Sequence, residues 1–334
     1  MSDTHESHGG GIRAAARRWG IPPHQWLDLS TGINPLPWPI PEIPAELWHR
    51  LPEEDGLSDQ LGSWLQAPSH ARCLPVPGTQ AAIQALPLLR APCRVAVPSP
   101  GYFEHGLCWE RGGHEVTYYA PGTLEQLDPE TIDVLVCIQP NNPTGQLESP
   151  HSLRQWARQL QRRGGWLIVD EAFLWPGHAS SMLPDCAQIG VLVLNSLGKF
   201  FGLAGARAGV VTGDGDLVRR LAEQLGPWSV PGPTRFLMAQ AVADRPWQQR
   251  MQRQLHERAQ RLDALLRDHG FSPQGDSPLF RYCPCDRATE YRDGLARSGI
   301  LVRLFEQPRA LRFGLPGAEG DWQRLTRALE LTNP

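Results

Sequence analysis

The chain has 334 residues, of which 41% are hydrophobic and 20% charged, and its formal net charge is -3. This composition is ordinary for a globular protein with a large and a small domain. The basic residues form no run, which argues against general nucleic-acid binding, and no apolar stretch is long enough to span a membrane. Residues 1–20 contain no apolar segment, so we expect no secretory signal and a cytoplasmic location.

Short apolar runs alternate with helical patterns between residues 58 and 225. This alternation predicts βαβ units and a mostly parallel sheet. The continuous apolar character of the runs indicates strands that are covered on both faces. The predicted strands are residues 94–98, 115–119, 133–138, 166–169, 190–194 and 208–212, and the predicted helices are residues 79–89, 102–111, 150–163 and 216–225.

The two ends of the chain have different patterns. Residues 21–52 are rich in proline and predict an arm packed on the surface, whereas residues 234–268 predict a long helix that Pro246 breaks or kinks. After Gly270 the pattern predicts a smaller α+β unit with strands at 279–283, 300–303 and 310–314 and helices at 288–298 and 321–331. We therefore expect an arm and part of the small domain in residues 1–48, a large domain in 49–268 and the rest of the small domain in 269–334.

The seven cysteines are odd in number, and their spacing fits neither a zinc site nor a redox CxxC motif. We expect reduced thiols that are mostly packed in the interior, and no metal site.

Lys199 is the one lysine among 32 lysine and arginine residues. GC-rich coding explains why arginine replaces lysine wherever a positive charge is enough, but it does not explain the lysine that stays. Arginine cannot become a neutral amine in a protein, whereas lysine can, and imine chemistry needs such an amine. Ser196 and Arg207 flank Lys199 in a stretch rich in small residues, where a backbone could closely approach a phosphate.

Other polar motifs follow predicted strands. Asp170 ends one strand, in the sequence Asp-Glu-Ala-Phe, at the position where α/β sheets place their ligands. A carboxylate beside a pyridine nitrogen would keep that nitrogen protonated. Asn142 follows another strand in the turn Asn-Asn-Pro-Thr-Gly, and Tyr102 follows Pro-Ser-Pro-Gly. Gly78 precedes a predicted helix whose amide groups would point at an anion.

Position by position, residues 196–209 resemble the lysine signature of the class I and II aminotransferases, which have the type I fold of enzymes that depend on pyridoxal 5'-phosphate (PLP). The resemblance implies that Lys199 binds PLP covalently, that Asp170 contacts the ring nitrogen and that Tyr102 stacks on the ring. These three are the predicted catalytic residues. The resemblance also implies further cofactor contacts, with Asn142 at the ring oxygen and Gly78, Thr79, Gln80, Ser196 and Arg207 at the phosphate. Many relatives have tyrosine at Phe173, which here cannot donate a hydrogen bond to the ring oxygen.

The segment 311–314 resembles the part of that family in which an arginine, here Arg312, binds the substrate carboxylate. Residues 8–13, 27–37 and 227–230 are similar to the threonine-phosphate decarboxylases of cobalamin biosynthesis. That resemblance implies decarboxylation of L-threonine O-3-phosphate to (R)-1-amino-2-propanol O-2-phosphate by a homodimer. Asn34, His8, Arg13 and Arg303 are the further substrate-binding residues that we predict, with His8, Arg13 and Arg303 as candidates for the substrate phosphate.

Two departures from the resemblance affect the substrate assignment. Leu51 stands where relatives have a tyrosine that reaches the cofactor phosphate of the partner subunit, and Gly11 replaces an asparagine of the arm. The alternatives are an aminotransferase acting on histidinol phosphate or a related compound, and a non-catalytic protein with the PLP fold that serves as a partner in cobinamide assembly.

Overall fold

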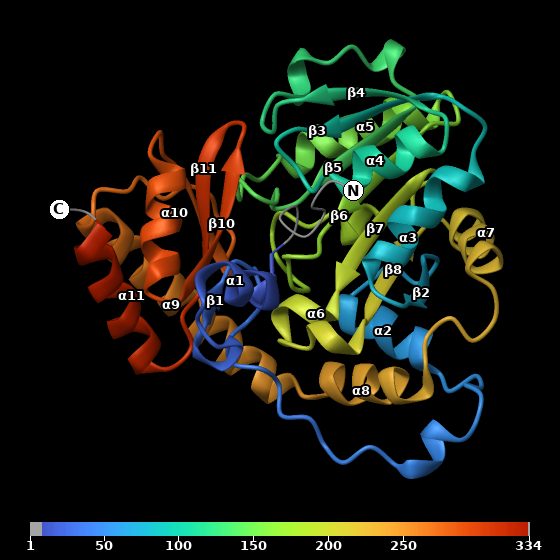
Figure 1. Cartoon of the computed structure of the whole chain (residues 1–334). Helices are drawn as coiled ribbons and strands as arrows, with labels where there is room; N and C mark the ends of the chain where they lie inside the picture. Colours follow the sequence, from blue (N-terminus) through green and yellow to red (C-terminus); the bar gives the residue numbers. More distant parts are fainter. Residues whose placement is uncertain (1–8, 333–334) are drawn as a thin grey trace. The chain divides into compact units, whose positions relative to one another are not determined.

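The computed structural model describes residues 9–332 and divides them into two compact units (Figure 1). One unit, called the large unit here, contains residues 37–142 and 146–249, and the other, the small unit, contains residues up to 36, residues 143–145 and residues from 250 onward. The division falls inside the long helix α9 (Arg245–Asp268).

A seven-stranded sheet forms the centre of the large unit, in the order β2-β8-β7-β6-β5-β3-β4. All neighbours pair in parallel except β8, which runs antiparallel to both β2 and β7. The sheet is therefore mostly parallel, as predicted. Its strands are β2 (Arg72–Val76), β3 (Arg94–Pro98), β4 (Glu115–Tyr119), β5 (Val134–Ile138), β6 (Trp166–Asp170), β7 (Val191–Ser196) and β8 (Gly209–Gly213).

Both faces of this sheet are covered, because every residue of β5, β6 and β8 is buried. A cluster of valine, leucine and isoleucine side chains from these strands packs against α3 (Thr79–Ala85), α4 (Glu104–Arg111) and α7 (Gly215–Leu225). Helix α5 (Pro150–Gln161) packs against β6. The remaining helices of the large unit are α2 (Leu57–Leu65), α6 (Leu197–Phe200) and α8 (Gly232–Ala243).

The predicted break in the helical pattern of residues 234–268 lies at Asp244, between α8 and α9, with Pro246 in the first turn of α9. Proline is tolerated at that position because the amides of a first turn have no partner within the helix.

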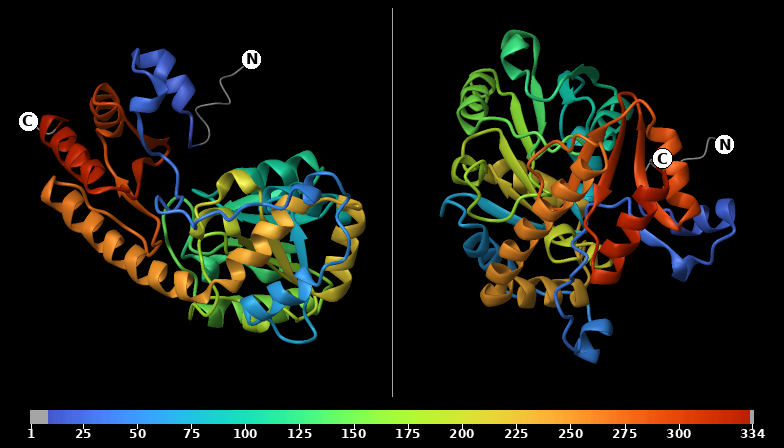
Figure 2. Two further views of the ribbon diagram at one scale, coloured as in Figure 1. Left: turned by 90° about the horizontal axis from the view of Figure 1, so that it is seen from below. Right: turned by 90° about the vertical axis from the view of Figure 1, so that its left-hand side faces the viewer.

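The small unit contains a second sheet in the order β1-β10-β11-β9. Strand β1 (Leu27–Leu29) pairs in parallel with β10 (Ile300–Glu306), and β10, β11 (Arg309–Gly314) and β9 (Phe280–Pro284) pair antiparallel. Helices α1 (Ile12–Trp19), α10 (Ala288–Arg297) and α11 (Glu319–Thr332) belong to this unit. Figure 2 shows α9 running beside α11, where Arg261 pairs with Glu319 at 2.6 Å.

The described residues contain no helix that is both long and apolar enough to cross a bilayer. Within the same range, no group of three or more His, Cys, Asp and Glu side chains is arranged to hold a metal ion. All seven cysteines are free thiols.

Candidate cofactor and substrate sites

Most of the predicted cofactor residues lie at one edge of the large sheet, the edge that the carboxyl ends of its parallel strands form. Strand pairing aligns Val76 with Gly209 and Gly209 with Ser196, while Asp170 is aligned with Leu194 on β7 and with Ile138 on β5. The parallel strands end at this edge and the antiparallel β8 begins there. The loops that carry Gly78, Tyr102, Asn142 and Arg207 therefore start or end at the edge where α/β sheets bind ligands.

Gly78 and Arg207 form a close approach between two of these loops. Gly78 has φ +76°, and a Cβ added to it would lie 2.6 Å from Nη2 of Arg207. Arg207 itself is in the left-handed region, with φ +52°. Gly209 also admits no side chain, because a Cβ there would lie 2.8 Å from the amide nitrogen of Thr79. The backbone of Gly78, Thr79 and Gly209 thus lies close to the Arg207 guanidinium, and we call this arrangement the cradle.

Replacement of Gly78 by alanine tests this cradle. The left-handed φ and the contact with Arg207 should together destabilise the protein by about 1–3 kcal/mol and weaken cofactor binding. Gly205→Ala is the matched control, since nothing lies within 4 Å of a Cβ there. Thermal unfolding and cofactor titration of both variants are the measurements, and equal behaviour of the two would contradict the cradle.

Ser196 ends β7 and directly precedes the short helix α6, which carries Lys199. The Ser196 side chain is the N-cap and its Oγ accepts a hydrogen bond from the amide of Gly198 at 3.2 Å. The Nζ of Lys199 lies 5.4 Å from the ring centroid of Phe173, which is buried. An ammonium group at this distance from an aromatic face is attracted by the ring quadrupole. Phe173 thus contacts the lysine with its ring, although it has no phenol to offer.

Asp170 is a buried carboxylate with two protein donors. Its Oδ1 accepts from the amide of Ala172 at 3.0 Å, and Nε2 of His105 lies 3.0 Å from its Oδ2. Both side chains of the His105–Asp170 pair are almost fully buried. Burial of a charge is costly unless it is paired and hydrogen-bonded, so His105 stabilises and orients this carboxylate.

His105 was missed in the sequence. The signal that could have found it is its spacing, because it lies three residues after Tyr102 at the start of α4, and residues at this spacing share a face of a helix. The two rings pack edge to face with centroids 6.2 Å apart.

Tyr102 is held by a chain of side-chain hydrogen bonds. Its hydroxyl donates to Oε1 of Gln80 at 2.9 Å, and Nε2 of Gln80 donates to Glu104 at 2.8 Å. Burial, with Glu104 and Asp170 nearby, raises the pKa of Tyr102 well above its usual value. The phenol therefore stays protonated near neutral pH. This arrangement fits a stacking platform better than a proton-transfer group.

Asn142 is half-buried in the loop after β5, and its neighbour Asn141 fixes that loop. Asn141 is buried, its Nδ2 donates to the carbonyl of Pro100 at 2.9 Å, and its amide donates to the carbonyl of Gln146 at 2.7 Å. The bond to Pro100 ties the Asn142 loop to the loop that precedes Tyr102, and the bond to Gln146 closes the Asn142 loop itself.

Glu171 is fully buried next to Asp170 and has no predicted role. Its carboxylate accepts from the Ser181 hydroxyl at 2.7 Å and from the amide of Met182 at 2.6 Å. Burial raises the pKa of Glu171 to about 7. The unfolded chain releases this proton near pH 4.5 and the folded protein near pH 7. The contribution of Glu171 to folding stability therefore falls as the pH rises between these values, and it does not change further above pH 7.

Glu171→Gln should remove this pH dependence. The wild-type protein should lose about 3 kcal/mol of folding free energy from this group between pH 4.5 and pH 7, whereas the variant should lose much less over that interval. Denaturant unfolding at pH 5 and pH 7.5 measures the difference. Identical pH slopes for the two proteins would show that Glu171 does not titrate in this window.

The predicted substrate residues lie in the small unit. Arg312 is buried on β11, its Nη2 donates to the carbonyl of Ser30 at 2.6 Å, and its guanidinium lies 5.1 Å from the ring centroid of Phe280. Arg303 is the direct partner of Arg312 on β10, and directly opposed residues project on the same face of a sheet. Burial and the nearby charge of Arg303 lower the pKa of Arg312 to about 9, so the guanidinium is still charged at neutral pH.

The other predicted substrate residues are less closely grouped. Asn34 is buried, and its Oδ1 accepts from the amide of Leu36 at 2.9 Å. Arg13 is exposed on α1. His8 lies outside the described residues.

The fold and the motifs together define a class of protein. The sequence matches the model of the family Aminotransferase class I and II over residues 57–330, and the chain belongs to that family. It is 48% identical over 323 residues to a threonine-phosphate decarboxylase of Pseudomonas aeruginosa, with 96% of each chain covered. It is 38% identical to a threonine-phosphate decarboxylase of Sinorhizobium sp, with 96% of this chain and 97% of the relative covered.

Two solved structures show the same fold. Histidinol-phosphate aminotransferase from Sinorhizobium meliloti, in complex with pyridoxal-5'-phosphate, has a TM-score of 0.79 at 16% identity, covering 99% of this chain and 97% of its own. L-threonine-O-3-phosphate decarboxylase from Porphyromonas gingivalis has a TM-score of 0.70 at 19% identity, covering 85% and 91%. The predicted type I fold is thereby confirmed, and family membership confirms PLP as the cofactor.

Proposed function

We propose that the protein is a PLP-dependent decarboxylase that converts L-threonine O-3-phosphate to (R)-1-amino-2-propanol O-2-phosphate. The observation that carries this proposal is the 48% identity to a threonine-phosphate decarboxylase over 96% of both chains. The product is the precursor of the aminopropanol linker in the corrinoid nucleotide loop, as the resemblance implies. The intact set of Lys199, Asp170 and Arg207 argues against a non-catalytic role.

The side chains of the large unit fit the cofactor. The buried Asp170 carboxylate suits a protonated ring nitrogen, and Lys199 supplies the amine for covalent attachment. The Arg207 guanidinium lies against the backbone at Gly78, where a guanidinium and backbone amides suit a phosphate. When bound, PLP withdraws electrons from the substrate α-carbon and so stabilises a carbanion. His105 would hold the Asp170 carboxylate in place to keep a proton on that ring nitrogen.

Two further roles follow for residues of the chain. Arg312 would bind the substrate carboxylate with two parallel hydrogen bonds, which fixes the orientation of the bond that breaks. Loss of carbon dioxide leaves an electron pair at the α-carbon, and one proton is taken up there. The ammonium form of Lys199 is the general acid that we propose for this step, and it becomes the neutral amine when its proton moves to the α-carbon. Arg303 is the candidate donor to the substrate phosphate.

Mixing the enzyme, PLP and L-threonine O-3-phosphate tests the proposal. We expect carbon dioxide and aminopropanol phosphate in equal amounts without any 2-oxo acid present. The competing function is amino transfer, which the family includes. Transfer of the amino group to 2-oxoglutarate without release of carbon dioxide would establish the competing function instead.

We also propose that the protein works as a homodimer. Three large apolar side chains of the large unit are exposed within residues 40–51, namely Ile40, Trp48 and Leu51, with 60%, 65% and 63% of their surface accessible. A second copy that packs on this segment would bury them. Sedimentation velocity should give twice the mass of the chain, and a monomer at micromolar concentration would contradict the proposal.

The free cysteines support a cytoplasmic location, where thiols stay reduced.

A further inference from the structure

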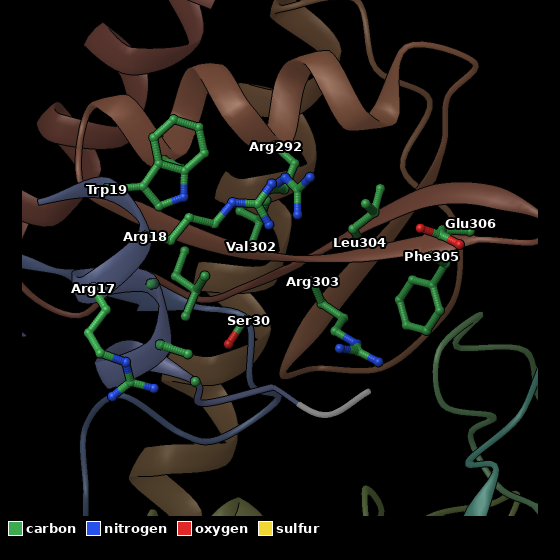
Figure 3. A pocket seen from close by; sticks show the side chains of 15 residues that line it. Arg17, Arg18, Trp19, Ser30, Arg292, Val302, Arg303, Leu304, Phe305 and Glu306 are labelled. Atoms are coloured by element: carbon green, nitrogen blue, oxygen red, sulfur yellow. The ribbon is translucent and has the colours of Figure 1, made fainter. Parts of the chain in front are cut away.

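A cavity of about 880 Å³ lies in the small unit, between α1, α10 and β10 (Figure 3). Cavities of this size hold organic ligands of some tens of atoms. Ser30 and Arg303 line part of this cavity and belong to the predicted substrate set or contact it, and Gly11 is the residue that replaces an asparagine of the arm. The other lining residues, among them Arg18 and Arg292, have no role in the proposed reaction.

Four arginines line the cavity and come from three different elements. Arg17 and Arg18 belong to the last turn of α1, Arg292 to α10 and Arg303 to β10, whereas Glu306 is the one carboxylate among those lining residues that the structure describes. A position in the last turn of a helix favours a cation through the helix dipole, but it does not require the side chain to face a cavity.

Arg18 and Arg292 point toward one another at one end of the cavity, beside Trp19, while Arg303 lies apart near Ser30 (Figure 3). Of the two, Arg292 has the largely buried side chain, whereas Arg18 is exposed. The side chain of Arg292 is 17% exposed, and its Nε lies 2.5 Å from Oδ1 of the adjacent Asp293. The guanidinium of Arg18 lies 5.7 Å from the ring centroid of Trp19. An arginine that is already positioned loses less conformational freedom when it binds an anion.

The rest of the wall is mostly apolar. It is formed by Ala14, Ala15, Ala296, Leu301, Val302, Leu304 and Phe305. Guanidinium groups recognise phosphate through paired hydrogen bonds, and an apolar wall beside them favours a ligand with a hydrophobic body. An inorganic ion alone would leave this wall uncovered.

We propose that this cavity binds an organic phosphate, with the phosphate held by Arg18 and Arg292 and the apolar body packed along Leu301 and Phe305. The phosphate position at Arg18 and Arg292 differs from that of Arg303, which lines the same cavity and is the candidate donor to the substrate phosphate. Its occupation does not depend on the decarboxylase activity.

Calorimetric titration with phenyl phosphate tests the proposal. The protein is the holoenzyme, with its cofactor reduced onto Lys199 so that the cofactor site is filled. We expect the double variant Arg18→Ala, Arg292→Ala to bind phenyl phosphate at least about tenfold more weakly than the wild type, which corresponds to about 1.4 kcal/mol. Inorganic phosphate should bind the wild type more weakly than phenyl phosphate does.

The matched control is the double variant Arg253→Ala, Arg267→Ala. It removes two charges from α9, where both residues are exposed, and neither residue lines the cavity. Its affinity should stay within about twofold of the wild type, and thermal unfolding checks that both variants are folded. Equal losses of affinity in the two double variants would show that only the total charge of the protein matters, and this would overturn the proposal.

Three other results would also overturn it. The first is the absence of binding to the wild type. The second is binding that survives in the double variant at Arg18 and Arg292 but is lost in Arg303→Ala, which would assign the probe to the substrate residues. The third is equal affinity for inorganic phosphate and phenyl phosphate, which would leave no role for the apolar wall. None of these results depends on turnover, so the proposed function can fail or hold independently.

Discussion

Lys199→Ala should lower turnover by at least about a thousandfold, because covalent attachment of the cofactor and the proposed proton transfer both need this amine. The chain offers a direct measurement. After borohydride reduction of the holoenzyme and proteolysis, the cofactor mass should appear on the peptide that contains Lys199, and no other lysine competes for it. The variant should give no labelled peptide and should lose the visible absorbance of the bound cofactor.

Lys199→Arg is the matched control for this prediction. It keeps the positive charge next to the Phe173 ring, but arginine cannot supply a neutral amine. The loss of turnover should therefore be as large as in the alanine variant, while the folded stability should be closer to that of the wild type. Substantial turnover in either variant would show that the reaction does not use this amine.

Arg312→Met is the second variant for which we expect a large effect. It should lower kcat/KM but leave the folded stability unchanged or higher. The loss of a bidentate, charge-assisted contact with the substrate carboxylate should lower kcat/KM by about a hundredfold to a thousandfold. The same change removes a buried charge, and replacement of buried charges by apolar side chains is often neutral or stabilising.

The pKa of Arg312 predicts the sign of the stability change. Burial and Arg303 lower this pKa to about 9, well below its ordinary value, so the folded protein releases the proton more readily than the unfolded chain does. The burial of Arg312 therefore costs folding stability as the pH falls from the ordinary value through 9, and the whole loss is present at neutral pH. Thermal unfolding of the apo-protein at pH 7 should show the methionine variant to be at least as stable as the wild type.

Arg309→Met is the control for this pair of measurements. Arg309 lies on the same strand, β11, but is exposed, so neither kcat/KM nor the melting temperature should change appreciably. A methionine variant of Arg312 with unchanged kcat/KM would show that another group binds the carboxylate. A strongly destabilised variant would show instead that the contact of Arg312 with Ser30 outweighs the burial of its charge.

The sequence predicted the parallel part of the sheet well, because its strands are continuous apolar runs. It did not predict β2, which has arginine, cysteine and proline among its five residues, nor β1, which has only three. Both strands are defined by the partners they pair with, β8 and β10, rather than by their own pattern. The helix α2 was missed for a similar reason, since it follows the proline-rich arm without a strong start signal.

The candidate site could be predicted where a motif identified the residue. The contacts made by the residues that support the motifs were not predictable, because these contacts join distant segments of the chain. His105 meets Asp170 across 65 residues of sequence, and Asn141 meets Pro100 across 41. The expected domain boundaries and the roles of the site residues stay predictions until the variants above are measured.

The antiparallel direction of β8 has a consequence for folding. Gly78 follows β2 and Arg207 precedes β8, and the antiparallel pairing brings these two loops together. The two strands lie more than 130 residues apart in the sequence. Closing so long a loop is entropically costly and slow compared with forming the βαβ units between them. The ability to bind phosphate should thus appear late in refolding, after the parallel strands have paired. A bound phosphate should also slow the separation of β2 from the sheet during unfolding.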